Sequence, residues 1–331
     1  MVSPLLPHKL ESVGPSPNSA QSARIRSESN KLAIAVGAGF VKAFDGASFY
    51  RLRSLVTRSI PLSGAGSEKQ LRVKIFNSRH AGEFAVGENL EASASLQSLK
   101  DGLKAEWYSP LALAAIAHLA PSGTELFTVN MVASIPTPNM AKSLAGLTGL
   151  HDVSVNGKRV TINVTGVKPL PEGLGTAYQV SADKPTAVID LGYQNTTVAG
   201  YDPTVRQMLD CVSLKTGVGM LFEAIADLCN TTGERPSAEE IRLGVEARTF
   251  ELNGYSGISF KEAYQQAFEP WLKARIHSAK NQASHVFGKC PVKVFAGGGS
   301  QLPGVADVAK HIGVNICQQP QETEVRGLYR L

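Results

Sequence analysis

The sequence predicts a two-lobed α/β protein, and three observations support this. First, residues 34–42 and residues 189–197 both have the pattern of a buried strand, a tight glycine-containing turn and a second strand. Second, such an internal repeat, with its copies far apart in the chain, indicates two similar half-molecules. Third, both halves combine strand-like with helical segments. We therefore expect an α/β protein of two similar lobes with a cleft between them.

Length and composition suit this fold class. A chain of 331 residues can form two cores, and 43% hydrophobic with 18% charged residues is typical of a soluble globular protein. The net charge of +5 permits contact with nucleic acid or anionic membrane but does not argue for it. No apolar run approaches the ~20 residues that span a bilayer. Four scattered cysteines suggest neither zinc nor disulfides, and without a secretory segment at the start we expect a cytoplasmic protein.

The first half is predicted to be rich in strands. Residues 1–30 contain many Ser, Pro and Asn and have the composition of a flexible tail. Residues 108–119 are nearly all apolar, which predicts a helix buried on most sides. Asn156-Gly157 is a strong hairpin signal and closes this half. Further strands are expected at residues 71–76, 83–86, 125–135, 153–155 and 160–164.

The second half is predicted to be mostly helical after its strand–turn–strand segment. Ser237 with Glu240, and Ser259 with Glu262, are capping-box patterns that mark helix starts. Pro270 is expected to kink or restart the second of these helices.

The first glycine turn can approach a phosphate. Gly37 and Gly39 have no side chains to block contact between the backbone amides and an anion. Lys42 lies just beyond and adds a positive charge. A short Gly-x-Gly in a hairpin is more often a plain turn, so this motif alone is weak.

The second turn carries the carboxylate. Asp190 ends an apolar strand, where a carboxylate is costly to bury without a partner, and a hydrated Mg²⁺ is a suitable partner. Asn195, Thr196 and Thr197 can add donors around phosphates. An Asp that only stabilises its own turn is the alternative. The first copy has Ala35 at the position of Asp190, so the two halves cannot have the same chemical role.

A third glycine-rich segment follows the strand at residues 292–296. Gly297, Gly298 and Gly299 let a flat ring or a sugar lie against the backbone, although three glycines are more often a linker. Pro303 then suits the first turn of a helix that runs to about residue 311.

The order and spacing of these motifs resemble the signature of the actin-like ATPase superfamily, which has two phosphate loops followed by an adenosine loop. The corresponding segments are residues 35–43, 189–192 and 296–307, and the resemblance covers about residues 32–331. It implies an α/β, actin-like two-lobed fold, with duplicated mixed β-sheets, flanking helices and a nucleotide cleft between the lobes. The expected division is a flexible tail (1–30), a first lobe with phosphate loop 1 (31–183), a second lobe with phosphate loop 2 and the adenosine loop (184–310), and a C-terminal segment returning to the first lobe (311–331).

Within the superfamily the chain looks most like the ParM/StbA branch. The features are the hairpin at residues 156–157 leading to residues 167–173, and the ending at residues 324–329. The resemblance implies a cytoplasmic homopolymeric filament formed with ATP (or GTP) and Mg²⁺, with hydrolysis coupled to polymerisation. Its role would be plasmid or DNA segregation, or a cytoskeletal one, through a DNA-binding or membrane-associated adaptor. No direct sequence-specific nucleic-acid binding by this chain is expected.

The resemblance also selects site residues. Asp190 would hold the metal through water and act in catalysis together with Asn139. Arg242 and Glu246, one helical turn apart, are candidates for the ribose and purine, with a solvated helix surface as the favoured alternative. The predicted nucleotide-binding set is Gly37, Ala38, Gly39, Phe40, Lys42, Gly192, Tyr193, Asn195, Thr196, Arg242, Glu246, Gly297, Gly298, Gly299 and Ser300.

Two departures from the superfamily pattern predict slow or altered hydrolysis. Ala35 stands where the first phosphate loop normally has an Asp that helps hold the metal. In the ParM branch a Glu shortly after a strand-ending Pro positions the attacking water, and residues 134–139 offer Asn139 instead. An Asn can orient a water but cannot take its proton, and general-base help is worth ~10²–10⁴ in rate.

Two other functions stay open. A scaffold with the actin fold but without ATPase activity is motivated by Ala35 and Asn139. A monomeric small-molecule kinase on the same fold would need an acceptor pocket and a base, and no extra carboxylate or histidine cluster stands near the three loops.

Overall fold

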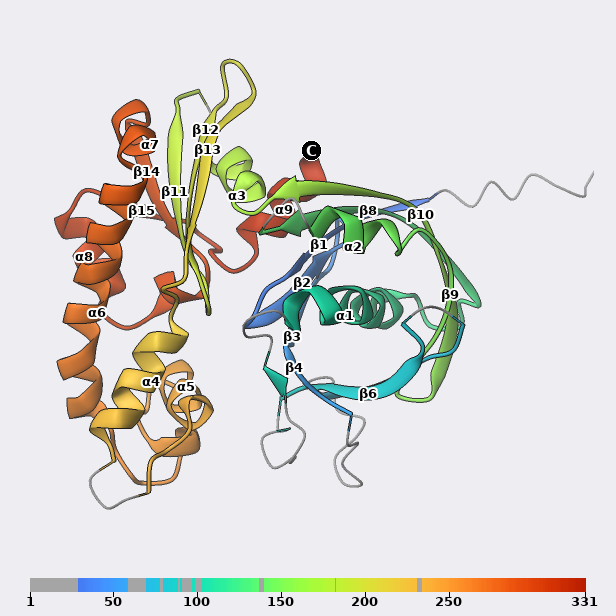
Figure 1. Ribbon diagram of the computed structural model, residues 1–331, viewed down its shortest axis with the longest axis horizontal. Helices are drawn as coiled ribbons and strands as arrows, with labels where there is room; N and C mark the ends of the chain where they lie inside the picture. The colour runs from blue at the N-terminus through green and yellow to red at the C-terminus, as the bar shows by residue number, and fades with distance from the viewer. Residues whose placement is uncertain are drawn as a thin grey trace, which may run out of the picture.

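The computed structural model describes residues 29–58, 70–77, 80–88, 90, 97–98, 103–136, 140–181, 183–230 and 234–331. They form two lobes, each built on one β-sheet, with the first lobe on the right of Figure 1 and the second on the left. Within these residues, no helix has the length and apolar character needed to cross a membrane.

The first lobe holds a curved ten-stranded sheet in the order β3-β2-β1-β8-β10-β9-β5-β6-β4-β7. Its strands are β1 (Asn30–Val36), β2 (Phe40–Phe44), β3 (Phe49–Arg53), β4 (Leu55–Thr57), β5 (Gln70–Ile75), β6 (Gly82–Gly87), β7 (Gln97–Ser98), β8 (Leu126–Ile135), β9 (Gly149–Val155) and β10 (Lys158–Pro171). Its helices are α1 (Leu103–Leu119) and α2 (Met140–Ala145).

The second lobe holds a five-stranded sheet in the order β13-β12-β11-β14-β15. Its strands are β11 (Thr186–Leu191), β12 (Thr196–Asp202), β13 (Gln207–Leu214), β14 (Val292–Ala296) and β15 (Asn315–Ile316). The remaining helices are α3 (Leu174–Val180), α4 (Gly219–Leu228), α5 (Ala238–Glu246), the short η1 (Leu252–Gly254), α6 (Lys261–Gln282), α7 (Ser284–Lys289), the short η2 (Gly298–Gln301), α8 (Val305–His311) and α9 (Thr323–Arg330).

The duplication predicted from the two glycine turns is confirmed. In both sheets the first strand of the repeat pairs antiparallel with its hairpin partner and parallel with the strand on its other side: β1 with β2 and β8, β11 with β12 and β14. Ala35 lies opposite Lys42, and Asp190 lies opposite Thr197. Each is the penultimate residue of its strand, so Ala35 and Asp190 occupy equivalent positions.

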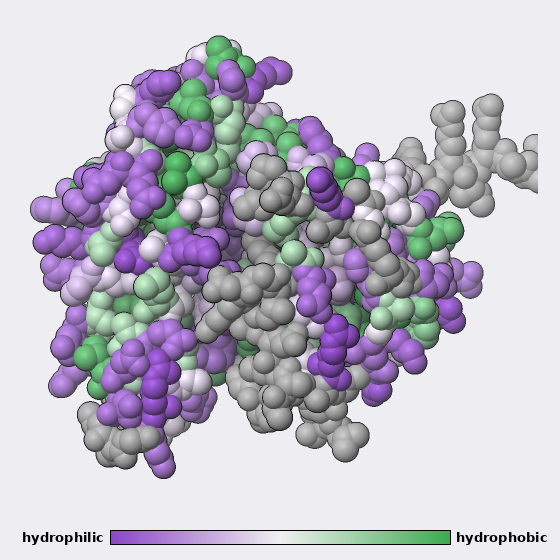
Figure 2. All heavy atoms as spheres, viewed as in Figure 1, coloured by the Kyte–Doolittle hydropathy of each residue, from purple (hydrophilic) through white to green (hydrophobic). Residues whose placement is uncertain are grey.

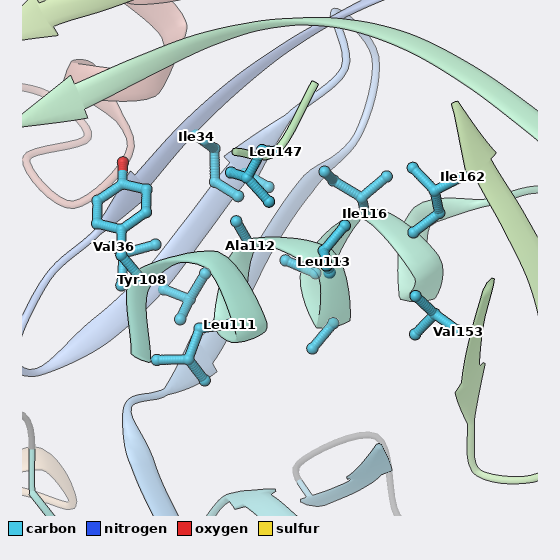
Figure 3. Close-up of a cluster of buried hydrophobic side chains, with 14 of the residues drawn as sticks. Ile34, Val36, Tyr108, Leu111, Ala112, Leu113, Ile116, Leu147, Val153 and Ile162 are labelled. Carbon is cyan, nitrogen blue, oxygen red and sulfur yellow. The ribbon is translucent and has the colours of Figure 1, made fainter. Parts of the chain in front are cut away.

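The core of the first lobe lies between its sheet and α1. Alternate residues of β1 point to opposite faces of the sheet, so Ile34 and Val36 face α1 while Ala33 and Ala35 face α9. Figure 3 shows apolar side chains of several strands around α1, together with Leu147, which follows α2. Such all-round burial explains why the helix at residues 108–119 was recognisable without an amphipathic stripe; it begins earlier, at Leu103.

Local sequence signals were mostly reliable. Asn156 and Gly157 both have positive φ (51° and 83°), as the predicted hairpin requires. The capping box at Ser237 is formed and starts α5. The second capping box is wrong, because α6 begins at Lys261 with Phe260 as its N-cap residue. The same helix continues through Pro270 without a restart.

Helices α3 and α9 pack against each other between the two sheets (Figure 1). They cross at Gly175 and Gly327, where a Cβ atom on Gly327 would lie 1.8 Å from the carbonyl oxygen of Gly175. Each helix also contacts a strand of the repeat, α9 contacting β1 and α3 contacting β11. The pair therefore joins the lobes through a contact that only glycines allow.

Candidate functional site

A cleft of about 660 Å³ lies between the lobes and is lined by residues from both. This volume suits a nucleotide-sized ligand. Residues from all three glycine-rich segments line it, so the tertiary structure brings together motifs that are far apart in the sequence. The predicted residues that line it are Gly37, Ala38, Gly39, Phe40, Lys42, Asp190, Gly192, Tyr193, Asn195, Arg242, Glu246, Gly298, Gly299 and Ser300.

The first turn is held from outside the cleft by the segment that follows β2. The carbonyl of Gly39 accepts hydrogen bonds from Arg53 Nη1 (2.6 Å) and from the Ser54 amide (3.0 Å). The carbonyl of Gly37 accepts one from Ser54 Oγ (2.8 Å). In a planar trans peptide the next N–H points opposite to the carbonyl, so the amides that follow these two carbonyls are turned away from Ser54. They are available to an anion in the cleft.

The second turn is held by main-chain contacts with the start of α4. The amides of Gly217, Val218 and Gly219 donate to the carbonyls of residues 192–194 at 2.8–2.9 Å. By the same geometry the N–H groups of residues 193–195 point away from α4. Both turns line the cleft, from opposite lobes, and both have amides turned away from the groups that anchor their carbonyls.

Gly297 serves the site indirectly. It is not among the residues that line the cleft, and its φ of 77° is in the region that favours glycine. A Cβ atom there would lie 2.1 Å from Asp190 Oδ1. Gly297 thus leaves space for the Asp190 carboxylate. Gly298 and Gly299, in contrast, line the cleft itself.

Two predicted residues need correction or lie outside the description. Thr196 is fully buried and does not line the cleft, because its hydroxyl donates to the carbonyl of Thr216 (3.0 Å) and fixes the base of the hairpin. Asn139 lies outside the described residues.

Glu172 is the most important residue that sequence reasoning missed. It lines the cleft and directly follows Pro171, where β10 ends. Its amide donates to the carbonyl of Ile135 at the end of β8 (2.9 Å). Because β8 and β10 are parallel neighbours, their ends meet at one edge of the sheet. The pattern of a Glu after a strand-ending Pro was present, but it belongs to β10 and not to β8.

A buried ion-pair network spans the two lobes beside the first turn. Arg53, on β3 of the first lobe, contacts Glu239 on α5 of the second at 2.8 Å, and Arg242 contacts the same carboxylate at 2.6 Å. Burial alone would raise the pKa of Glu239, but the two guanidinium groups outweigh it and hold that pKa at about 2. Glu239 therefore ties together the first turn, the second lobe and Arg242.

Arg242 is not solvated helix surface, contrary to the alternative favoured above. The residue is 1% exposed and lines the cleft, and it also pairs with Glu246 one turn later. Its Nε has no hydrogen-bond partner among the described residues. An orphaned buried donor in a cleft is expected to meet an acceptor on a ligand.

A second group of hydrogen bonds at the cleft joins segments that are far apart in the chain. Arg51 Nη1 donates to the side-chain oxygen of Gln321, whose amide nitrogen donates to Gln301 Oε1 (2.7 Å). Arg248 Nη2 donates to the Gln301 carbonyl (2.6 Å). All four residues line the cleft, and none is in the predicted nucleotide-binding set, although Gln301 lies within the predicted adenosine loop.

The carboxylates of the cleft fit a hydrated divalent cation better than a fully protein-ligated metal. Across the described parts of the chain, no three or more His, Cys, Asp or Glu residues gather closely enough to hold a metal ion. Asp190 and Glu172 line the cleft together with both glycine turns. Mg²⁺ in nucleotide sites keeps several waters and takes one or two carboxylates, which matches this set.

The duplicated sheets and the cleft between the lobes are features of the actin-like fold. Residues 33–175 match the family model described as the actin-like proteins N-terminal domain. The first lobe is thus assigned by sequence, and the rest of the chain by its fold. A sequence search of curated proteins found no significant match.

Solved structures show that the fold is that of ParM and its archaeal relatives. The archaeal actin homologue Ta0583, solved in complex with ADP, is 18% identical with a TM-score of 0.70, covering 91% of this chain and 98% of that one. A ParM filament structure from Clostridium botulinum gives 15% identity and 0.67, with 91% and 98% covered. Apo ParM from pSK41 gives 16% and 0.63, with 91% and 97% covered. The chain is therefore a ParM-like actin-like protein in fold.

Proposed function

We propose that this chain binds ATP (or GTP) with Mg²⁺ in its cleft and assembles into filaments. The observation that carries the proposal is the pair of turns, one from each lobe, that line one cleft while their carbonyls are anchored, which leaves the amides that follow them turned away from the anchors. An anionic chain of phosphates is the ligand such paired amides suit. An archaeal homologue solved with ADP and a ParM solved as a filament support nucleotide binding and assembly.

The residues divide the work of binding. Lys42 and the amides of the two turns would hold the phosphates, and Asp190 would hold the waters of Mg²⁺. When bound, Mg²⁺ would neutralise charge on the phosphates. Arg242, with its orphaned Nε, and Glu246 would meet the ribose or purine.

Glu172 replaces Asn139 as the proposed residue for water activation. In hydrolysis the water oxygen bonds to the γ-phosphorus, the bond to the bridging oxygen of the diphosphate breaks, and the water's proton is taken up by a base. A carboxylate can take that proton, whereas an amide cannot. Glu172 lines the cleft, so hydrolysis need not be slow for lack of a base. Ala35 remains the departure that favours altered turnover or a scaffold without ATPase activity.

The proposed cellular role is plasmid or DNA segregation, or a cytoskeletal role, in the cytoplasm. Cargo would be attached through a DNA-binding or membrane-associated adaptor. The support is the likeness to ParM proteins, and the cleft itself carries no information about cargo.

The test is pelleting and negative-stain microscopy with ATP, with a non-hydrolysable analogue and without nucleotide, while phosphate release is followed. We expect filaments with nucleotide and measurable release. Filaments without release would favour the scaffold, and no filaments in any state would refute the proposed assembly. Asp227→Asn is a suitable control variant, since Asp227 pairs with Arg235 on an exposed surface outside the cleft.

A further inference from the structure

One buried carboxylate lies at the meeting point of the lobes but outside the residues that line the cleft. Glu324, on α9, is 5% exposed. Its Oε1 accepts hydrogen bonds from Ser134 Oγ and from the Gly173 amide, both at 3.1 Å. Its Oε2 accepts from the Thr176 amide (2.8 Å) and the Thr176 hydroxyl (2.9 Å). Four donors therefore hold the carboxylate oxygens.

Two of these donors, on Gly173 and Ser134, are close in the chain to Glu172 or to the residue that accepts its amide. Gly173 is the next residue in the chain, and Ser134 precedes Ile135, whose carbonyl accepts the Glu172 amide. Gly173 is the N-cap residue of α3 and has no side chain to cap the helix. The free amides of the first helical turn are instead satisfied from another helix, by Glu324.

Ser134, one of these donors, is also held from the opposite side of the sheet. The Tyr108 hydroxyl donates to the Ser134 carbonyl (2.7 Å). Figure 3 shows Tyr108 on α1 with its oxygen pointing away from the helix axis. Ser134 is thus bonded through its carbonyl to α1 and through its hydroxyl to α9.

Ala35 leaves space for this arrangement. It pairs with Ser134 in the register of β1 and β8, and paired residues of neighbouring strands point to the same face. Ala35 packs in the apolar cluster that includes Val325 and Leu328 of α9. On the face where the second lobe has Asp190 on its repeat strand, the first lobe has a small residue and a carboxylate supplied by α9.

A carboxylate is an expensive way to cap a helix here. Burial raises the pKa of Glu324, and the nearby charge of Glu172 raises it further. An Asn or Ser at the N-cap would satisfy an amide at lower cost. Glu324 accepts a hydrogen bond from the amide of Gly173, the residue that directly follows Glu172. This contact indicates that the buried carboxylate serves to hold Glu172 in place.

We propose that Glu324 is a positioning residue for hydrolysis: it holds the segment from Glu172 to Thr176 so that the Glu172 carboxylate faces the cleft. The inference rests on the proposed function. It also makes the C-terminal helix part of the catalytic apparatus, because α9 connects to the cleft through this carboxylate.

The experiment measures kcat and KM for phosphate release, the affinity for a non-hydrolysable ATP analogue, and hydrogen exchange in residues 172–180. Glu324→Gln is expected to lower kcat about 10- to 100-fold, since misplacement by ~1 Å can cost 10². KM and analogue affinity should change by less than about two-fold, and exchange should rise only in that segment. Thr176→Val, which removes one donor and keeps the side-chain shape, should lower kcat by a smaller factor.

The matched control is Glu322→Gln. Glu322 is the N-cap residue of the same helix and pairs with Arg326, so the substitution removes the same charge without touching α3. It should leave kcat unchanged.

Three results would overturn the inference. Glu324→Gln and Thr176→Val with wild-type kcat would show that the contact does not position Glu172. A fall in analogue affinity, with faster exchange across both lobes, would show a purely structural role. A wild-type protein that binds the analogue but releases no phosphate would refute the proposed hydrolysis, and this role with it; the wild-type rate distinguishes that failure from the first two.

Discussion

The two strand–turn–strand hairpins share one topology and differ in what holds them and in their charge. The turn between β1 and β2 is held by Arg53 and Ser54, is followed by Lys42, and has no carboxylate on its first strand. The turn between β11 and β12 is held by main-chain amides at the start of α4 and follows Asp190. Duplication places one glycine turn from each lobe at the cleft. In the proposed function, the unequal side chains would divide the contacts with phosphate and metal between the two turns.

The hairpins also differ in what they depend on. The second turn is anchored within its own lobe, by Gly217 to Gly219. The first is anchored by Arg53, which itself pairs with Glu239 of the other lobe. We infer that the geometry of the first turn depends on how the lobes sit relative to each other, whereas the second turn keeps its geometry.

The largest expected effect concerns the carboxylate proposed to activate water, which follows β10 and belongs to neither hairpin. Glu172→Gln should lower the rate of phosphate release by ~10²–10⁴, because the amide cannot accept the water's proton. Asn139→Ala should leave the rate unchanged. A rate that falls with Asn139→Ala and not with Glu172→Gln would return the role to the end of β8.

The next effect tests the asymmetry between the repeats. Asp190→Asn should lower phosphate release on the order of 100-fold, because the waters of the metal lose the anionic acceptor that orients them. Ala35→Asp should bring no gain. It would add a carboxylate on the face that α9 and Glu324 occupy, so we expect lower stability, by about 1–3 kcal/mol in thermal or urea unfolding. A faster Ala35→Asp variant would show that the first hairpin lacks a metal contact.

The third prediction concerns the dependence of the first hairpin on the second lobe. The pKa of Glu239 is about 2 against an ordinary 4.5, so its ion pairs stabilise the fold above about pH 4.5 and lose that contribution as the pH falls toward 2. Unfolding measured across this window should show a loss of roughly 1–3 kcal/mol in the wild type. Arg53→Met should show a smaller loss, since one partner is already absent; equal losses in both proteins would contradict the inter-lobe role.

The smallest effect comes from the contact between the two turns themselves. A Cβ atom on Gly39 would lie 2.8 Å from the Cβ atom of Tyr193, so Gly39→Ala must push the turns apart. We expect roughly 10-fold weaker binding of an ATP analogue, about 1.4 kcal/mol, measured by calorimetry. Gly288→Ala is the control, because its added Cβ would meet nothing within 4 Å. Unchanged binding in Gly39→Ala would mean that the turns act independently.

The outer surface gives less indication of function than the cleft does. On the face in Figure 2, hydrophobic side chains are scattered among hydrophilic ones, with one group at the tip of the β12–β13 hairpin. Val205, within that connection, is 62% exposed, and Tyr255 in another loop is 81% exposed. Scattered exposed apolar residues are normal for a folded surface.

Sequence reasoning failed where it had to choose between two strand ends. Pro136 and Pro171 both end strands, and the Glu that follows Pro171 was passed over for the region after Pro136. The order of the strands in the chain does not indicate that these two strand ends are neighbours. β9 lies between β8 and β10 in the sequence, yet β10 pairs with both of them. The interpretation of Arg242 as solvated helix surface was wrong for a similar reason, since the burial of this residue depends on Glu239 and on the facing lobe.

The sequence by itself determined the repeat, the order of the three glycine-rich segments and the asymmetry between Ala35 and Asp190, because turns, strand periodicity and residue identity are local properties. Only the tertiary structure decided which carboxylates matter around them. Glu172 faces the cleft, Glu239 joins the lobes and Glu324 caps a helix from another element through contacts between residues up to 190 positions apart. Such contacts are set by how sheets and lobes pack, and no local pattern in the chain encodes them.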